Sequence, residues 1–244
     1  MKDYKKQGTI SGELELDGNL ILTGDLVVEK WIEVKGYIDC AGYSIKAGGF
    51  IKAGGFIKAG GSIEAGGFIE AGDSIEAGGF IEAGGFIKAG GFIEAGYSIK
   101  AGGFIKAGDS IKAGGSIEAG GSIEAGYSIE AGYSIEAGYS IETGDSIKAG
   151  YSIEAGDSIE AGDSILTQLW IKCKTTLSAQ FYIYAGVITW RERTAEDAVI
   201  ECGKLESGKI EFGTLKELGT GEVSLSGKEV EVKLDGKTYI AVIR

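Results

Sequence analysis

Hydrophobic and polar residues alternate along this chain in a pattern that repeats every six residues. Isoleucine recurs at each sixth position from Ile45 to Ile165, 21 positions in all, and alanine stands two residues after each one except at Thr143 and Thr167. The same spacing continues less regularly upstream and to about residue 186. A repeat this constant is the signature of a solenoid, in which each unit is stable only when stacked on its neighbours.

Within a unit such as Phe-Ile-Lys-Ala, strand geometry places alternate side chains on opposite faces. Of the residues that follow Ile, eight are Lys and twelve are Glu, and charged residues in such numbers cannot be buried. Ile and Ala are therefore predicted to point inward, and the outer face to carry the charges together with the Phe or Ser before Ile. The glycine that follows Ala predicts a corner with unusual backbone angles. The next residue, which is Gly, Tyr or Asp, is placed on the corner itself, because buried aspartates would be too costly.

Three such strands around a triangle would bury a continuous column of Ile and Ala. The predicted fold is all-β: a single-stranded, three-sided parallel β-helix with about 18 residues per coil. Left-handed hexapeptide acyltransferases carry a small residue two places before the large aliphatic one, whereas here Ala comes two places after Ile. Right-handed winding is therefore favoured. An α-helix is disfavoured by the glycine content of each unit.

The pattern divides the chain into three regions. Residues 1–44 are predicted to form irregular coils, in which one residue is inserted between Ile38 and Ile45. The segment Met1–Gln7 is expected to be loose. Residues 45–188 predict the regular β-helix. Residues 189–244 predict a loop, a final coil and a β-hairpin over Val230–Ile240 with an Asp-Gly turn, which would form a small C-terminal β cap over the open end of the solenoid.

Composition and charge narrow the chemistry. The chain has 44 Gly, no Pro, no His and a net charge of −12, which argues against direct binding of nucleic acid. The start lacks a signal-peptide core and no long apolar run follows, so we expect a cytoplasmic location and no membrane insertion. Cys40, Cys173 and Cys202 stand in positions that Ala occupies elsewhere, which indicates core residues rather than a redox or metal site. No cofactor, metal site or enzymatic activity is expected, since a nucleophile with its base and a phosphate loop are both missing from the sequence.

The 18-residue period aligns several outward residues in columns, which make candidate interaction surfaces. One column holds aromatic residues: Phe50, Phe68, Phe86 and Phe104. These rings could simply cover an outer groove, or they could form an apolar strip for a partner or for self-association. Another column holds carboxylates: Asp73, Asp109, Asp145 and Asp163. The simpler interpretation is an ordinary solvent-exposed face, and the alternative is a surface that imitates a phosphate backbone. A third candidate is the basic and aromatic cluster on the break in the repeat, either a plain loop or a contact site: Trp190, Arg191 and Arg193.

Two resemblances follow from these motifs. The upstream Gly-x-Leu/Ile-x-Val pattern resembles bactofilins, bacterial cytoskeletal proteins, which implies a right-handed three-sided β-helix. The Ala-Gly-[Gly/Tyr/Asp]-[Phe/Ser]-Ile-[Lys/Glu] array and the tail from Ala185 to Gly208 are similar to uncharacterised hexapeptide-repeat β-helix proteins of gut bacteria and their phages. That similarity implies no particular activity.

Two functions therefore remain open from the sequence. The first is a non-enzymatic structural scaffold, a rigid β-solenoid rod that binds a protein partner or associates with itself. The alternative is an acidic decoy-type inhibitor, such as a phage would encode, that blocks a nucleic-acid-binding host defence protein.

Overall fold

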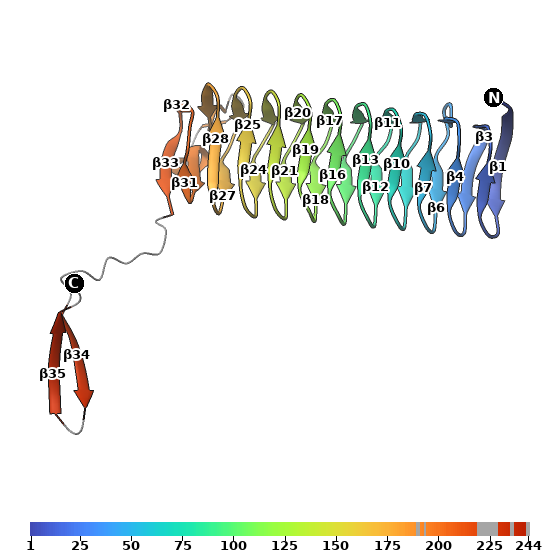
Figure 1. Ribbon diagram of the computed structural model, residues 1–244. Helices are drawn as coiled ribbons and strands as arrows, with labels where there is room; N and C mark the ends of the chain where they lie inside the picture. The colour runs from blue at the N-terminus through green and yellow to red at the C-terminus, as the bar shows by residue number, and fades with distance from the viewer. Residues whose placement is uncertain (189–190, 193, 219–228, 235–236, 243–244) are drawn as a thin grey trace.

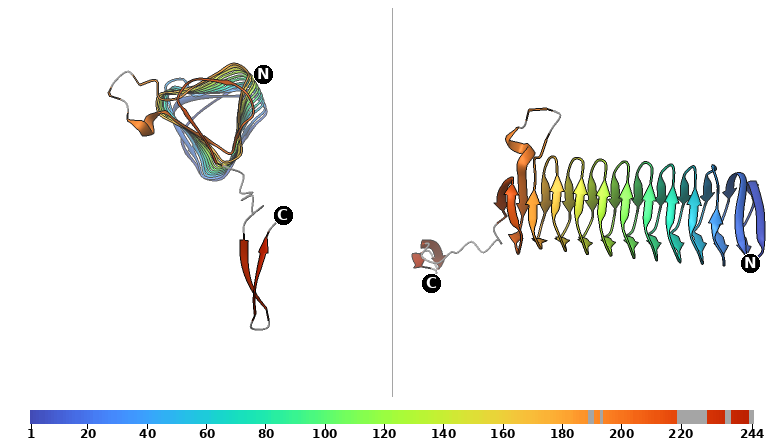
Figure 2. Two further views of the ribbon diagram at one scale, coloured as in Figure 1. Left: turned by 90° about the vertical axis from the view of Figure 1, so that its left-hand side faces the viewer. Right: turned by 90° about the horizontal axis from the view of Figure 1, so that it is seen from above.

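The chain winds into a stack of triangular coils, seen from the side in Figure 1 and down the axis in Figure 2. The computed structural model describes residues 1–188, 191–192, 194–218, 229–234 and 237–242. Most strands are three residues long, and each pairs in parallel with the strand one coil further along, as Ile69 with Ile87. The all-β, three-sided parallel β-solenoid is confirmed together with its predicted coil length, and its right-handed winding stays a prediction.

The strands form three faces. The first face is an 11-stranded sheet: β2 (Leu14–Leu16), β4 (Ile32–Val34), β7 (Ile51–Ala53), β10 (Ile69–Ala71), β13 (Ile87–Ala89), β16 (Ile105–Ala107), β19 (Ile123–Ala125), β22 (Ile141–Thr143), β25 (Ile159–Ala161), β28 (Thr176–Ala179) and β31 (Lys204–Leu205). The other two faces are joined by the long strand β3 (Asn19–Val28), which bends from one to the other.

The second face continues from the first part of β3: β5 (Ile38–Asp39), β8 (Ile57–Ala59), β11 (Ile75–Ala77), β14 (Ile93–Ala95), β17 (Ile111–Ala113), β20 (Ile129–Ala131), β23 (Ile147–Ala149), β26 (Ile165–Thr167), β29 (Tyr182–Tyr184) and β32 (Lys209–Phe212). The third face continues from the second part of β3: β6 (Ile45–Ala47), β9 (Ile63–Ala65), β12 (Ile81–Ala83), β15 (Ile99–Ala101), β18 (Ile117–Ala119), β21 (Ile135–Ala137), β24 (Ile153–Ala155), β27 (Ile171–Cys173), β30 (Val199–Cys202) and β33 (Thr214–Glu217).

Isoleucine and alanine fill the interior as predicted. The repeat isoleucines from Ile45 to Ile165 are fully buried, and the alanines that follow them are nearly so. Strand pairing keeps them in register, so that Ile69 lies between Ile51 and Ile87. Burial of one such side chain is worth about 1.5–3 kcal/mol, which makes this column the main stabilising feature of the solenoid.

The glycine that directly follows Ala in each unit, the first corner position, is required because successive coils pack closely there. At Gly102 an added Cβ would lie 2.2 Å from the carbonyl oxygen of Gly84 in the preceding coil. The sequence-based explanation, unusual backbone angles, is wrong, because glycines in the left-handed region lie elsewhere: Gly8, Gly12, Gly186, Gly208 and Gly213. The second corner position lies on the corner itself, as predicted, and Tyr97 there is 68% exposed. At Gly103, which occupies this position, an added Cβ would lie 3.3 Å from the backbone of Gly85.

The N-terminal segment is ordered, so the prediction that Met1–Gln7 is loose is wrong. Asp3–Ile10 forms β1, which pairs in parallel with β3 across two faces. The free edge of β3 offers unpaired backbone groups, and Tyr4 and Ile10 pack against the core, which offsets the cost of ordering a charged segment. The inserted residue is visible at Ala41, which alone among the described non-glycine residues has a positive φ, 47°.

The C-terminal end of the solenoid is less well covered than the middle. The interior columns end on Leu205 and Ile210, which are half-buried, and on Leu215, which is 36% exposed. Beyond it, β34 (Glu229–Leu234) and β35 (Lys237–Val242) pair antiparallel, which confirms the hairpin, while its Asp-Gly turn lies outside the described residues. That this hairpin caps the solenoid stays a prediction.

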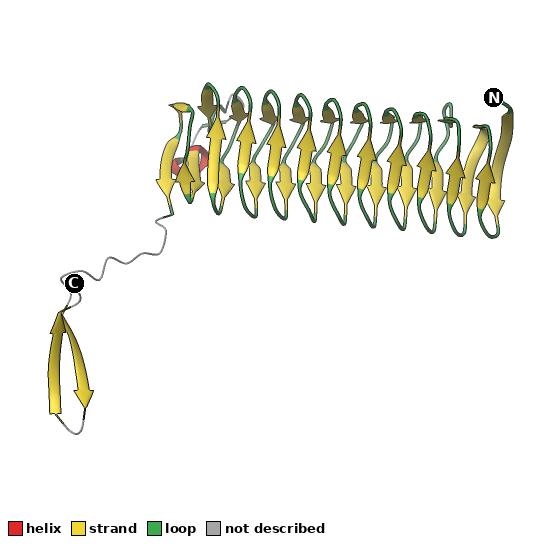
Figure 3. Ribbon diagram, viewed as in Figure 1, coloured by secondary structure: helices red, strands yellow, loops and turns green. Residues whose placement is uncertain are grey.

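Helix is almost absent from the described part of the chain, as Figure 3 shows. Within the described ranges the helical element is a single 3-10 helix, η1 (Ala195–Ala198), in the loop between β29 and β30. Among the described residues, no helix has the length and apolar character needed to cross a membrane.

Candidate interaction surfaces

The predicted phenylalanine column forms a continuous stack of rings along one edge of the first face. Each ring belongs to the residue just before a strand of that face, so the parallel register places the rings directly above one another. Ring centroids from Phe50 to Phe68, Phe86 and Phe104 are 4.8 Å apart, and the planes differ by 2–5°. Trp31 extends the stack at 5.3 Å from Phe50. We call these five residues the aromatic ladder.

The aromatic ladder covers its own ring faces and leaves its edges on the surface. Phe50, Phe68 and Phe86 are half-buried, whereas Phe104, the last ring, is 39% exposed because Ser122 follows it in the column. Charged residues of the same face run beside the ladder, and Glu70 lies between Lys52 and Lys88 at 3.9 and 3.6 Å. The surface therefore has an apolar strip with a column of positive and negative side chains beside it.

A second, interrupted aromatic column lies on the second face. Tyr37 and Phe56 stack with centroids 4.6 Å apart, Ser74 follows, and Phe92 stands one coil further on. The residues that line a groove of about 310 Å³ include Phe56, Ser74 and Phe92. Lys58, Asp73 and Glu76 lie at the same groove, and Lys58 and Glu76 form an ion pair at 2.8 Å.

The four predicted aspartates share one corner of the prism. Backbone hydrogen bonds link this corner from coil to coil, as from Asp163 N–H to the carbonyl of Asp145 at 2.9 Å and from Asp109 N–H to Gly91 at 3.2 Å. Asp145 and Asp163 occupy successive coils, whereas Asp73, Asp109 and Asp145 are each separated by one coil that carries Gly91 or Tyr127 there. The structure brings the four into one column, although not into contact as a single cluster.

Glutamates of the C-terminal half form two further columns that the sequence-based prediction did not single out. On the first face Glu142 lies between Glu124 and Glu160, and on the third face Glu136 lies between Glu118 and Glu154. Lysines in the N-terminal half pair with glutamates of the adjacent coil, for example Lys46 with Glu64 at 2.6 Å. Acidic columns without interspersed lysines are thus concentrated near the C-terminal half.

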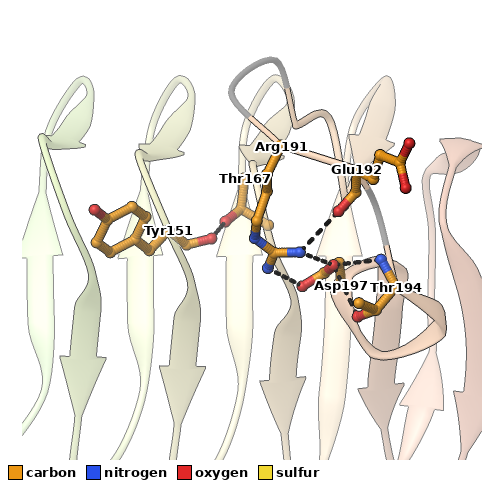
Figure 4. A network of polar contacts seen from close by, with 6 residues as sticks. All are labelled: Tyr151, Thr167, Arg191, Glu192, Thr194 and Asp197. Carbon is orange, nitrogen blue, oxygen red and sulfur yellow. Dashed lines mark hydrogen bonds and ion pairs between the residues drawn. The ribbon is translucent and has the colours of Figure 1, made fainter.

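The loop between β29 and β30 protrudes from one corner and is held by a compact polar network (Figure 4). The Arg191 guanidinium donates to both oxygens of the buried Asp197 carboxylate, at 2.7 and 2.6 Å. Thr194 donates to the same carboxylate from its backbone N–H and its hydroxyl. These donors hold the pKa of Asp197 well below its usual range.

The Arg191 guanidinium is thus bound within the loop, to the Asp197 carboxylate, which favours the interpretation of this segment as a structural loop. Trp190 and Arg193 lie outside the described residues.

The three cysteines are core residues, as predicted. Cys40, Cys173 and Cys202 are free thiols and buried in the column that Ala fills elsewhere. Burial raises the pKa of Cys40 and of Cys173 to about 12 and that of Cys202 in the same direction. A nucleophilic thiolate is therefore disfavoured at each of them. In the part of the chain that the structure describes, no cluster of Cys, Asp and Glu has the arrangement of a metal site.

Comparisons of the chain with protein-family models, curated proteins and solved structures gave no match. The structure shows a parallel stacking of short β-strands, which is compatible with a β-helix architecture, and the resemblance to bactofilins and to hexapeptide-repeat proteins stays an expectation from the sequence.

Proposed function

We propose that this protein is a non-enzymatic scaffold, a rigid β-solenoid rod that presents its outer columns to a protein partner. The observation that carries the proposal is the aromatic ladder. The rings of Phe50, Phe68 and Phe86 stack in register with centroids 4.8 Å apart, and the paired strands behind them hold this spacing. A strip of apolar ring edges beside charges of both signs is typical of a protein interface, where aromatic residues act as anchors and charges set orientation. The rigid frame lowers the entropy lost on binding.

Affinity capture from the source cell, followed by mass spectrometry, tests this proposal. The bait is the full chain, compared with a variant that carries Phe86→Lys and Phe104→Lys. A matched control carries Ser128→Lys and Ser146→Lys, which add the same charge to outward positions of the second face. We expect the ladder variant to lose a partner that the wild type and the control both retain. Identical sets of captured proteins for all three baits would contradict the proposal.

A second candidate function, the acidic decoy, is favoured by the glutamate columns of the C-terminal half. One carboxylate per coil gives an axial spacing of about 4.8 Å, a regular line of negative charge along a rod. Such a line could occupy a basic groove that normally holds a nucleic acid, and attraction of this kind weakens with added salt.

Competition against DNA for a basic nucleic-acid-binding protein tests the decoy. Glu136→Gln with Glu154→Gln should weaken competition more than Glu64→Gln with Glu82→Gln, which removes the same charge from the N-terminal half of the same face. Equal effects of the two pairs, or binding that does not depend on salt, would contradict the decoy function.

A further inference from the structure

The second face contains a gap in a column of aromatic rings. Ser74 stands between Phe56 and Phe92, and the register of the strands behind them, Ile57 to Ile75 to Ile93, places the three residues in successive coils. The Ser74 hydroxyl accepts a hydrogen bond from the backbone N–H of Phe92 at 3.2 Å. It is therefore turned back toward the backbone, and the space between the two phenylalanines forms the groove of about 310 Å³.

The spacing of this gap along the axis matches one aromatic ring. Phe56 and Phe92 are two strand spacings apart along the axis, about 9.6 Å. A ring placed midway would lie at the separation that the aromatic ladder adopts, where Phe68 is 4.8 Å from both Phe50 and Phe86. The first face thus shows in the same chain how this position looks when a side chain fills it.

The gap is also singular among the described coils. The ladder ends at Phe104, so the groove beside Ser122 has an aromatic wall on one side only. Phe80 on the third face has Ser62 and Ser98 as its neighbours in the column. Within the described residues, only Ser74 has a phenylalanine in the coil before it and another in the coil after it.

The charges at the gap favour a cationic neighbour for that ring. The Lys58 ammonium is paired with Glu76, whereas the exposed Asp73 on the adjacent corner has no cation within ion-pair distance among the described residues. One negative charge is left in excess at the mouth of the groove. A lysine or arginine beside the inserted ring would pair with it.

We propose that the gap between Phe56 and Phe92 binds one aromatic side chain of a partner protein, flanked in that partner by Lys or Arg. This inference rests on the proposed function as an interaction scaffold and assigns the partner's chemistry at one position. The inserted ring would stack on two parallel rings and be desolvated on both faces, as hot-spot residues of interfaces are.

The experiment uses the isotope-labelled full chain and short peptides, followed by backbone amide NMR. The probe is acetyl-Lys-Phe-Lys-amide, with acetyl-Lys-Leu-Lys-amide and acetyl-Glu-Phe-Glu-amide as comparisons. We expect shifts centred on the amides of Ser74 and Phe92, with a dissociation constant in the millimolar range for a single ring. Either comparison peptide should bind at least about fivefold more weakly.

Ser74→Phe fills the gap from within and provides the decisive variant. It should unfold at a higher temperature than the wild type, which shows that the ring has joined the column, and should lose peptide affinity by about tenfold or more. Ser128→Phe is the matched control, because Ser110 and Ser146 flank it in the same column. That control should bind the peptide as the wild type does.

Two results would overturn the proposal: unchanged binding by Ser74→Phe, or no shift at Ser74 and Phe92 with any peptide. Its failure can be told apart from failure of the scaffold function. If the Ser74→Phe chain still captures the cellular partner that the Phe86 and Phe104 variant loses, the scaffold stands and the gap is not a binding site.

Discussion

The aromatic ladder predicts a measurable difference between two phenylalanines that occupy equivalent positions in the repeat. Phe68 has a ring on each side, Phe50 and Phe86, at 4.8 Å with interplanar angles of 2° and 5°. Phe80 precedes a strand of the third face in the same way, but serines lie above and below it in its column. Phe68→Ala therefore removes two stacking contacts, and Phe80→Ala removes none.

The expected difference follows from the number of stacked pairs. An aromatic pair is worth about 0.5–1.5 kcal/mol beyond the area it buries. With two pairs lost, Phe68→Ala should lower the free energy of unfolding by about 2 kcal/mol more than Phe80→Ala. A double-mutant cycle between Phe68 and Phe86 should give a coupling of about 1 kcal/mol.

The free energies of unfolding are measured by guanidinium denaturation followed by circular dichroism. If the wild type and both variants show the same dependence of this free energy on denaturant concentration, the same cooperative unit unfolds in each. Equal losses of stability, within about 0.5 kcal/mol, would refute the reasoning. The rings would then contribute as separate surface groups, and the ladder could not be treated as a preformed strip.

Three further predictions concern the frame. Gly102→Ala should lower the free energy of unfolding by about 3 kcal/mol or more because its Cβ meets a carbonyl of the preceding coil, whereas Gly103→Ala, with 3.3 Å available, should cost about 1 kcal/mol or less in the same denaturation assay. Thr143→Ala should raise that free energy by about 1 kcal/mol, because its buried hydroxyl has no partner in the described structure, while Thr167→Ala should lower it, because its hydroxyl donates to a carbonyl of the preceding coil. The thiols should react with a disulfide reagent only after unfolding, since burial raises the pKa of Cys40 to about 12; reaction of the native chain as fast as of the unfolded chain would contradict this.

The interior could be predicted from the sequence because two independent rules agree there. Alternation within the strand assigns Ile and Ala to one face, and the exclusion of Lys and Glu from the core decides which face is inside. The 18-residue period then aligned Phe50 with Phe68 and Asp145 with Asp163 without further information.

Features that depend on one inserted residue could not be aligned in this way. The separation of Trp31 and Phe50 exceeds the regular period, because Ala41 adds a residue in that coil with a positive φ. A fixed period therefore leaves Trp31 out of the ladder and Tyr37 out of the stack with Phe56. Tracking the buried Ile38 and Ile57 across the insertion would have recovered both.

Other features depend on interactions that residue patterns do not encode. The charged segment from Asp3 to Ile10 gives a weak strand pattern, and it becomes a strand because the edge of β3 offers hydrogen-bonding groups along two faces. The close approach of Gly102 to Gly84 likewise appears only when coils are stacked in three dimensions. A glycine in a repeat indicates a restriction without showing whether the cause is a backbone angle or a neighbouring atom.

The regularity of the coils also determines where a partner can be recognised specifically. A partner that slides along the rod by one coil meets nearly the same surface wherever a column is uniform, as along Glu124, Glu142 and Glu160. Such a column contributes affinity but cannot fix the position of the partner, because adjacent registers differ little in energy. Register is fixed only where a column is interrupted, as at Ser74 between two rings or at the last ring, Phe104. Substitutions at these interruptions should therefore alter specificity more than substitutions within the uniform columns.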